Sequence, residues 1–215
     1  MQGEVTKPDY WLDWADVIDA ASGDVRRLDY VIRYSSIPVN FKESVSAHSY
    51  WVSLYSLLIH RKISTDTSLI GPILLKAVIH DVAEAKTGDL VRTFKYSLPE
   101  LKEAVDKAED LIVSSFHDQI SSLFGLFTSM VGTDDLKYVE AVVKAADFLS
   151  LQQFMNREWL RGNREITPFF ERMLTELDSA SEKVFGSDDS RIRSLWSLYN
   201  RMKYTAVHPN KLTAV

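Results

Sequence analysis

Apolar residues recur at intervals of three and four along most of the chain, which is the spacing of α-helices with one buried face. The spacing is clearest over residues 44–61, 68–86, 99–116 and 134–161. No stretch alternates as a half-buried strand would, and no Asn-Gly or Asp-Gly pair predicts a hairpin turn. The pattern therefore predicts an all-α protein.

Caps and helix-breaking residues set the expected boundaries. Helices are predicted over residues 10–21, in a short segment after Asp24 that carries Leu28, Val31 and Ile32, and over residues 44–61, 68–86, 99–116, 120–130, 134–161, 168–184 and 190–204. Residues 34–43 and 87–97 are predicted to be irregular, because they contain Pro38 and Gly88. In the helix over 44–61, the predicted buried stripe consists of Trp51, Leu54, Tyr55 and Leu58.

The length of 215 residues suits one domain, and the chain contains no repeat and no linker-like stretch. We expect a single helical-bundle domain over residues 1–215. Its parts would be an N-terminal helical extension (1–29), a core that carries the chemistry (30–160), C-terminal helices (161–207) and a tail (208–215). Trp11 and Trp14 in the extension are expected to serve helix packing or a subunit contact.

Composition excludes several classes of protein. With 25 basic and 30 acidic residues, the net charge of −5 argues against a nucleic-acid partner. The Arg157, Arg161 and Arg164 cluster, interleaved with Glu158 and Glu165, is expected to be a solvated helix face.

The chain has no cysteine, which excludes thiolate metal sites, cysteine nucleophiles and disulfides. It also shows no apolar segment long enough to cross a membrane and no leader pattern. A cytoplasmic location (host cytoplasm for a viral protein) with no membrane partner is the resulting expectation.

Ionisable residues within apolar surroundings are the candidates for chemistry. His80, Asp81 and Glu84 would share one face of a continuous helix over 68–86, among small and aliphatic neighbours. His48 occupies the first turn of an apolar helix, and Asp147 lies within another apolar stretch. Buried charges of this kind are costly unless they pair or bind a metal.

Two histidines and two aspartates form a mixed nitrogen and oxygen donor set. His48, His80, Asp81 and Asp147 would suit Zn²⁺, Mn²⁺, Co²⁺ or Fe²⁺. Taken singly, each residue has a plainer interpretation: His48 as a buried histidine with ordinary partners, Asp147 as the partner of Lys144 or Arg33. The other histidines lack partners at ligand spacing. His60 is expected to be a cation at a helix C-terminus, and His117 and His208 to be exposed.

Three sequence blocks resemble the HD-domain phosphohydrolases, and more closely their 5′-deoxynucleotidase branch. They are Val31-Ile32-Arg33-Tyr34, then Glu43-Ser44-Val45-Ser46-Ala47-His48-Ser49, and His80-Asp81-Val82-Ala83-Glu84-Ala85-Lys86-Thr87-Gly88-Asp89-Leu90 with a later Lys95-Tyr96. The resemblance runs from about Tyr30 to Phe154. It implies the HD-type helical bundle, a small nucleotide as substrate and a homo-oligomer.

The resemblance also implies residue roles. His48, His80, Asp81 and Asp147 would bind the metal, and Glu84 would orient or deprotonate the attacking water. Arg33 would hold a phosphate, Tyr34 would contact the substrate, Asp89 would contact the sugar or assist proton transfer, and Lys95 would reach a phosphate. Plainer alternatives are a salt bridge of Arg33 with Asp29 or Glu43, a turn role for Asp89 and solvation of Lys95.

Two positions depart from the family pattern. Tyr34 stands where the family often has Trp, and Leu90-Val91 stands for Leu-Pro. Both lie where a base and sugar would be expected to pack, so they bear on nucleotide preference rather than on hydrolysis.

The leading functional hypothesis is a metal-dependent 5′-deoxynucleotidase that converts a deoxynucleoside monophosphate and water to deoxynucleoside and phosphate. The second is a deoxynucleoside triphosphate triphosphohydrolase, for which Lys86, Arg92 and Lys95 could hold the longer phosphate chain. A helical module that binds metal without turnover, and a helical interaction protein without metal, are the non-enzymatic alternatives.

Overall fold

The structure is a computed structural model that describes residues 23–95, 97–116, 118–172, 175, 185 and 188–207. The elements are a 3₁₀-helix, η1 (Asp24–Asp29), and the α-helices α2 (Val45–Ile63), α3 (Ile70–Ile79), α4 (Glu84–Thr87), α5 (Arg92–Lys95), α6 (Pro99–Ser114), α7 (Asp118–Met130), α8 (Thr133–Leu160) and α10 (Ser190–Val207). Within the described residues there is no strand, only one isolated antiparallel bridge between Ile32 and Ser44. The all-α prediction is confirmed.

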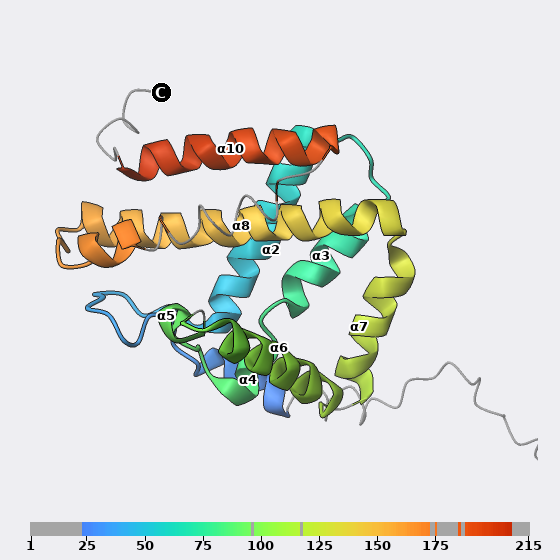
Figure 1. Cartoon of the computed structure of the whole chain (residues 1–215), viewed down its shortest axis with the longest axis horizontal. Helices are drawn as coiled ribbons and strands as arrows, with labels where there is room; N and C mark the ends of the chain where they lie inside the picture. The colour runs from blue at the N-terminus through green and yellow to red at the C-terminus, as the bar shows by residue number, and fades with distance from the viewer. Residues whose placement is uncertain are drawn as a thin grey trace, which may run out of the picture.

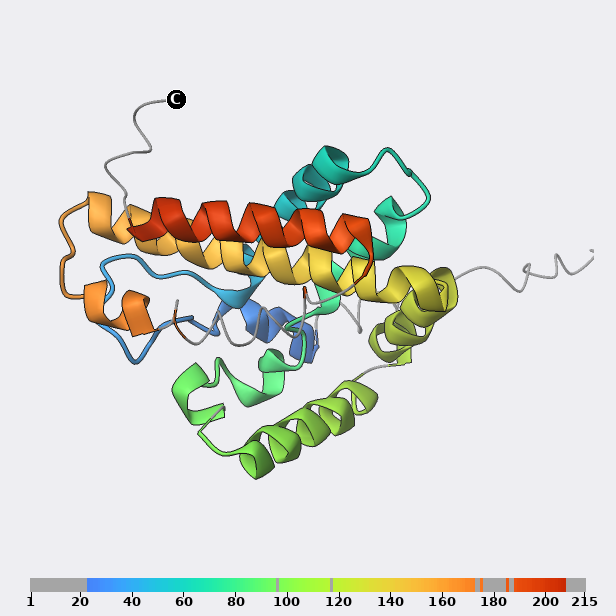
Figure 2. The ribbon, with the colours of Figure 1, turned by 45° about the horizontal axis from the view of Figure 1, so that its top comes forward.

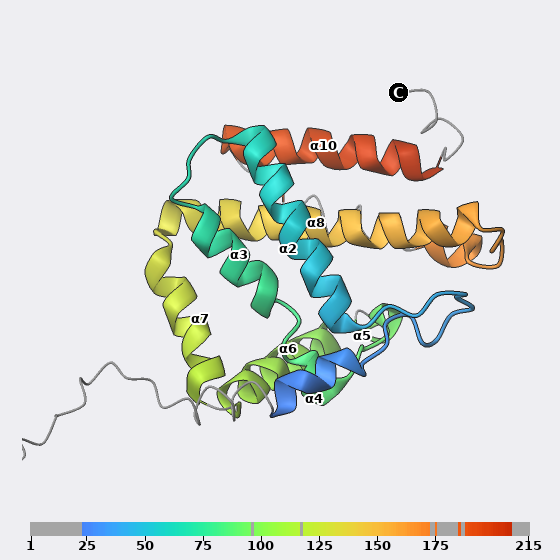
Figure 3. The ribbon, with the colours of Figure 1, turned by 180° about the vertical axis from the view of Figure 1, so that it is seen from behind.

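Helix α8 is the central element of the bundle (Figure 1). Helices α2 and α3 cross it on one side, as the view from behind shows most clearly (Figure 3). Helix α10 runs beside α8 along much of its length (Figure 2). Helices α4, α5 and α6 and η1 gather beyond the N-terminal end of α2 and the C-terminal end of α3 (Figure 1).

Small side chains allow α8 to be covered on more than one side. Ala141, Ala145 and Ala146 are fully buried in it, together with Val139 and Val142. Alanine combines the highest helix propensity with little bulk, so neighbouring helices can approach closely without a loss of helix stability. This buried length of helix carries Asp147 into the interior.

The predicted buried face of α2 is wrong at Trp51 and Leu58, whereas Leu54 and Tyr55 are partly buried and Tyr55 packs against the core. Trp51 is 41% exposed and Leu58 is 59% exposed, and Trp51 instead stacks on Tyr55. The face that packs inward holds smaller and more polar residues, namely Val45, His48, Val52, Ser56, Ile59 and His60. The sequence offers two faces that could be covered, and the close approach of α8 selects the one with the smaller side chains.

The single helix predicted over 68–86 is also wrong, because it breaks at the residues of interest. Helix α3 ends at Ile79, and the chain turns before α4 begins at Glu84. In the turn, the amide of Val82 donates to the carbonyl of Ile79, a bond one residue shorter than that of an α-helix. His80 and Glu84 therefore do not share the face of a continuous helix.

Smaller corrections concern other segments. The short helix after Asp24 is the 3₁₀-helix η1, and it ends before Val31 and Ile32. The connection predicted over 87–97 contains α5. The predicted boundaries of α6, α7, α8 and α10 agree with the structure to within a few residues.

Other predictions fall largely or wholly beyond the described part of the chain. The helix over 10–21 with Trp11 and Trp14, the tail, His117 and His208 lie outside it. Of the helix predicted over 168–184, residues 168–172 and 175 are described, and they are helical.

His60 lies in the last turn of α2, in agreement with its predicted place at a helix C-terminus. Its side chain is fully buried. Its Nε2 lies 2.7 Å from the carbonyl oxygen of Asp66 and therefore donates to it, and its Nδ1 lies 3.0 Å from the hydroxyl of Tyr138. His60 thus joins α2 and α8 in the core.

Glu158 is a buried carboxylate rather than part of a solvated face, and it fixes the loop that precedes α2. It accepts hydrogen bonds from the amides of Asn40 and Phe41, at 2.8 and 2.7 Å, and from the side chain of Asn163 at 2.7 Å. Burial by itself would raise the pKa of Glu158, but these hydrogen bonds outweigh it and lower the pKa. The loop leading to Arg33 and Tyr34 is thereby tied to the end of α8.

We expect Glu158→Gln to destabilise the fold by about 2–4 kcal/mol, because an amide nitrogen would face backbone N–H donors that now reach a carboxylate. Chemical denaturation at pH 7 measures the change, and Glu165→Gln at an exposed position is the control. Because the folded-state pKa is lowered, the contribution of Glu158 is present above its unfolded pKa and is lost as pH falls through the folded pKa. A destabilisation equal to that of the control would contradict the assignment.

Candidate metal centre

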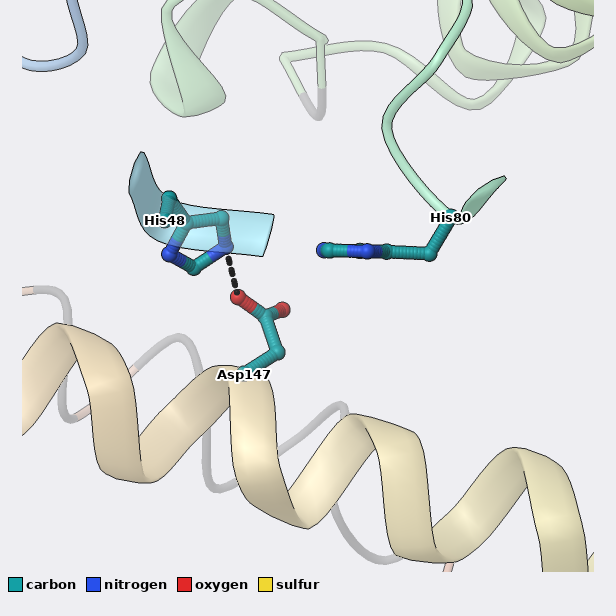
Figure 4. Close-up of side chains that lie close together, drawn as sticks. All are labelled: His48, His80 and Asp147. Carbon is teal, nitrogen blue, oxygen red and sulfur yellow. Dashed lines mark ion pairs between the residues drawn. The ribbon is translucent and has the colours of Figure 1, made fainter. Parts of the chain in front are cut away.

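Three predicted residues from distant parts of the sequence meet in space. His48 comes from the first turn of α2, His80 follows the end of α3, and Asp147 lies midway along α8 (Figure 4). One potential ligand atom from each lies within 4.8 Å of the others. His48 Nε2 is 3.2 Å from Asp147 Oδ1, and the two imidazoles point toward each other with ring centroids 5.4 Å apart (Figure 4).

Asp81 borders the same cluster. Its Oδ2 lies 3.1 Å from His80 Nε2 and 3.6 Å from His48 Nε2. The turn after α3 thus brings two consecutive side chains to the cluster, as the His-Asp pair predicts.

The histidine nitrogens that face the carboxylates have no hydrogen-bond partner of good geometry. Nε2 of both His48 and His80 is buried and unsatisfied. For His80 the protonation is set by geometry: Nδ1 lies 2.7 Å from the carbonyl oxygen of Ala77, which can only accept. Nδ1 of His80 therefore carries hydrogen, and Nε2 is the nitrogen left to bind a metal. Burial opposes a charge on this ring, but Asp81 and Asp147 outweigh it and raise the pKa of His80.

The charges of the cluster favour a bound cation. Burial, together with Arg33, lowers the pKa of His48 to about 4, so this imidazole is neutral at pH 7. Burial opposes the charge of Asp147, yet Lys144 and His48 hold its pKa well below the usual range. Two imidazoles beside ionised carboxylates are the donor set that binds a divalent transition metal, which displaces any proton from the ligating nitrogen, so the residues fit such an ion.

Glu84 lies at the start of α4, on the far side of the turn from His80. Burial, reinforced by the negative charges of Asp81 and Asp89, raises its pKa to about 9. Its Oε2 is buried without a partner. A divalent cation among these carboxylates would counter the raised pKa and favour the ionised form of Glu84.

Arg33 is also placed beside this acidic cluster. Burial opposes its charge, but Tyr34 and Asp147 are the largest of the influences that raise its pKa. Its Nη1 is buried and has no hydrogen-bond partner. The alternative salt bridge to Asp29 is absent from the described residues, where Asp29 pairs with Arg26. The contact between Arg33 and Glu43, the other alternative partner, is a backbone hydrogen bond in which the amide of Arg33 donates to the carbonyl of Glu43.

Tyr34 adopts a left-handed backbone with φ 58°, which is unusual for a residue with a side chain. Its amide donates to Asp89 Oδ2 at 2.9 Å, and its ring packs on Phe154 with centroids 4.6 Å apart. Through this hydrogen bond Asp89 holds the segment that carries Arg33. A residue with only a turn role would not be expected to make such a contact.

Lys95 is directed to α6 rather than to the cluster. Its ammonium lies 2.7 Å from Glu109 and 3.5 Å from Asp106. The plainer alternative of simple solvation is wrong, because the side chain is 19% exposed and ion-paired.

Sequence reasoning missed two residues beside the cluster. Ser150 Oγ lies 3.1 Å from His48 Nδ1, and Glu43 Oε1 lies 3.8 Å from the same nitrogen. Glu43 stands in a matched motif block, but serine within an apolar helix carries no signal for a site.

A family model, described as 5′-deoxynucleotidase YfbR-like, matches residues 23–185. The chain belongs to the YfbR-like 5′-deoxynucleotidase family. As a member, it is a metal-dependent phosphohydrolase that acts on nucleotides. No curated protein matches the chain in sequence.

Solved structures share the fold of this YfbR-like protein. The cyanophage S-2L HD phosphohydrolase DatZ, bound to dA and one catalytic Zn²⁺, has a TM-score of 0.62 and 16% identity over 85% of this chain and 95% of its own. A Pyrococcus horikoshii protein has a TM-score of 0.62 and 20% identity over 87% and 98% of the two chains.

A third similar structure is an HD-domain phosphohydrolase from Listeria innocua. Its TM-score is 0.57, with 18% identity over 87% of this chain and 99% of its own. The YfbR-like protein therefore has the HD-domain fold. Among the described residues, no helix is both long and apolar enough to cross a membrane.

Gly88 provides a test of the loop that carries Asp89. Its backbone, with φ 72° and ψ 174°, lies in a region that essentially only glycine adopts. Gly88→Ala should lower stability by about 1–3 kcal/mol from backbone strain alone, because a Cβ there would meet nothing within 4 Å. Thermal or urea unfolding measures the loss.

Gly125 in α7 is the matched control, since a Cβ there also meets nothing within 4 Å. Gly125→Ala should instead stabilise by about 0.5–1 kcal/mol, because alanine favours the helix. The same sign of change at both positions would contradict the strained loop.

Proposed function

We propose that this chain is a 5′-deoxynucleotidase that hydrolyses a deoxynucleoside 5′-monophosphate to the deoxynucleoside and inorganic phosphate. The observation that carries the proposal is the convergence of His48, His80 and Asp147, with unsatisfied Nε2 atoms, beside the unpaired Nη1 of Arg33. Membership of the YfbR-like family supports the same substrate class. The dA bound to the structurally similar DatZ is consistent with a deoxynucleoside product.

His48, His80, Asp81 and Asp147 would hold the metal. A divalent ion there would polarise a phosphoryl oxygen and lower the pKa of water. Zn²⁺, Mn²⁺, Co²⁺ and Fe²⁺ all suit two imidazoles and two carboxylates. The Zn²⁺ bound by DatZ makes zinc the first ion to test.

Glu84 would orient the attacking water or take its proton. Its buried Oε2 has no partner in the protein and so is available for that hydrogen bond. The guanidinium of Arg33 stays charged and offers a planar fork that matches phosphate oxygens. Asp89 would act on the substrate side by holding Tyr34 and Arg33 in place, through its bond to the Tyr34 amide.

The surroundings favour a monophosphate over a triphosphate. Two of the three cations that could hold a longer phosphate chain already have partners. Lys95 pairs with Glu109, and Lys86 lies 2.9 Å from Asp24 and 3.0 Å from the hydroxyl of Ser115. A triphosphate carries more charge and would need further cations, so the engagement of Lys95 and Lys86 elsewhere supports monophosphate hydrolysis. Triphosphohydrolase activity is the second candidate, and the product distinguishes it.

The purified protein with Zn²⁺, Co²⁺ or Mn²⁺ should release deoxynucleoside and inorganic phosphate from deoxynucleoside monophosphates. Each deoxynucleoside mono- and triphosphate, with ribonucleotides alongside, would be incubated and the products separated by ion-exchange chromatography. Release of intact triphosphate would instead establish the triphosphohydrolase. Metal binding without any product would point to the non-catalytic alternative.

Glu84→Ala should lose at least about 100-fold in kcat while it retains the metal, because a positioned acid or base contributes that much to catalysis. Asp81→Ala should lose bound metal and activity together. Metal content by elemental analysis, measured beside kcat, separates the two roles. Activity that survives in Glu84→Ala, or full metal content in Asp81→Ala, would contradict the respective assignment.

A further inference from the structure

The imidazole of His48 contacts α8 through both of its nitrogens. On one side, Nε2 lies 3.2 Å from Asp147 Oδ1, and on the other, Nδ1 lies 3.1 Å from Ser150 Oγ. Asp147 and Ser150 are three residues apart, so they share one face of the helix. Two residues from one turn of α8 thus contact the two nitrogens of the imidazole ring.

The hydroxyl of Ser150 differs from those of Ser49 and Ser53 in the partner that it takes. Ser49 and Ser53 each donate to a carbonyl one turn earlier in α2, at 3.0 and 2.8 Å, as helical serines commonly do. Ser150 is 3% exposed, and within the described residues its hydroxyl has His48 as its partner. The hydrogen bond therefore spans two helices.

A metal on Nε2 fixes the protonation of the ring. A neutral imidazole that gives its Nε2 lone pair to a metal must carry its hydrogen on Nδ1, and that N–H needs a buried acceptor. Glu43 Oε1 is 3.8 Å away, which is longer than a hydrogen bond. Ser150 Oγ, at 3.1 Å, is within reach.

We infer that Ser150 is a positioning residue that accepts the Nδ1 hydrogen of His48 and so holds its Nε2 lone pair toward the metal. The inference rests on the proposed metal site. The chemistry suits serine, because a hydroxyl can donate to Nδ1 in the metal-free ring and, after rotation, accept from it in the metal-bound ring. His80 needs no such side chain, since the carbonyl of Ala77 performs that role.

The test compares Ser150→Ala with Ser56→Ala. Ser56 is fully buried in α2, and its hydroxyl has no partner within the described residues, so its loss removes the same atom without removing a bond. Dissociation constants for Zn²⁺ and Co²⁺ would be measured by competition with a chelator. The visible spectrum of the Co²⁺ protein and the melting temperature of the metal-free protein would be recorded beside them.

Ser150→Ala should weaken binding of both metals by about 10–100-fold and alter the Co²⁺ spectrum, the usual effect of removing a partner of a metal-bound histidine. Ser56→Ala should change the dissociation constants for Zn²⁺ and Co²⁺ by less than about 3-fold. Ser150→Thr, which keeps the hydroxyl, should recover most of the affinity. If its added methyl group prevents folding, the two alanine variants decide between the outcomes.

Equal affinities of Ser150→Ala and wild type, or equal losses in both alanine variants, would overturn the role of Ser150 while leaving the metal site intact. A wild-type protein that binds neither Zn²⁺ nor Co²⁺ would overturn the metal site itself, and the role of Ser150 with it.

Discussion

The packing of α2 against α8 is the constraint on which the site depends. It buries the small and polar face of α2 rather than its aromatic face, and so carries His48 fully inside the protein beside Asp147. The alanines of α8 make this approach possible, and the bond from Ser150 adds a second point of contact with the same ring. Burial of these groups is costly, and a bound cation would offset much of that cost.

The other residues of the candidate site are positioned by interruptions in the regular helices. The turn after α3 points His80 and Asp81 at His48, and the residues beyond it lead into α4 with Glu84. The left-handed backbone of Tyr34 is tied to Asp89, and the loop behind it is tied to Glu158. Strained or irregular backbone near a site persists because surrounding bonds over-determine it, and these carboxylates provide such bonds.

The charge pattern separates binding groups from structural ones. Arg33 keeps an unpaired nitrogen among carboxylates, whereas Lys95 and Lys86 are each held by acidic partners on other elements. A cation that already has a carboxylate partner has less to gain from a phosphate than one that lacks a partner. This difference supports the proposed preference for a monophosphate, and the spacing of residues in the sequence does not reveal it.

The sequence by itself determined the all-α class, most helix boundaries and the convergence of His48, His80, Asp81 and Asp147, because helical periodicity is local and the motif blocks are specific. The tertiary structure decided which face of α2 is buried, where the helix after Ser68 breaks and which cations are already paired. It also decided the place of Ser150, whose partner His48 lies more than 100 residues away in sequence, and of Glu158, whose partners Asn40 and Phe41 are as distant. Such long-range pairings depend on how helices pack, and local sequence patterns do not encode that packing.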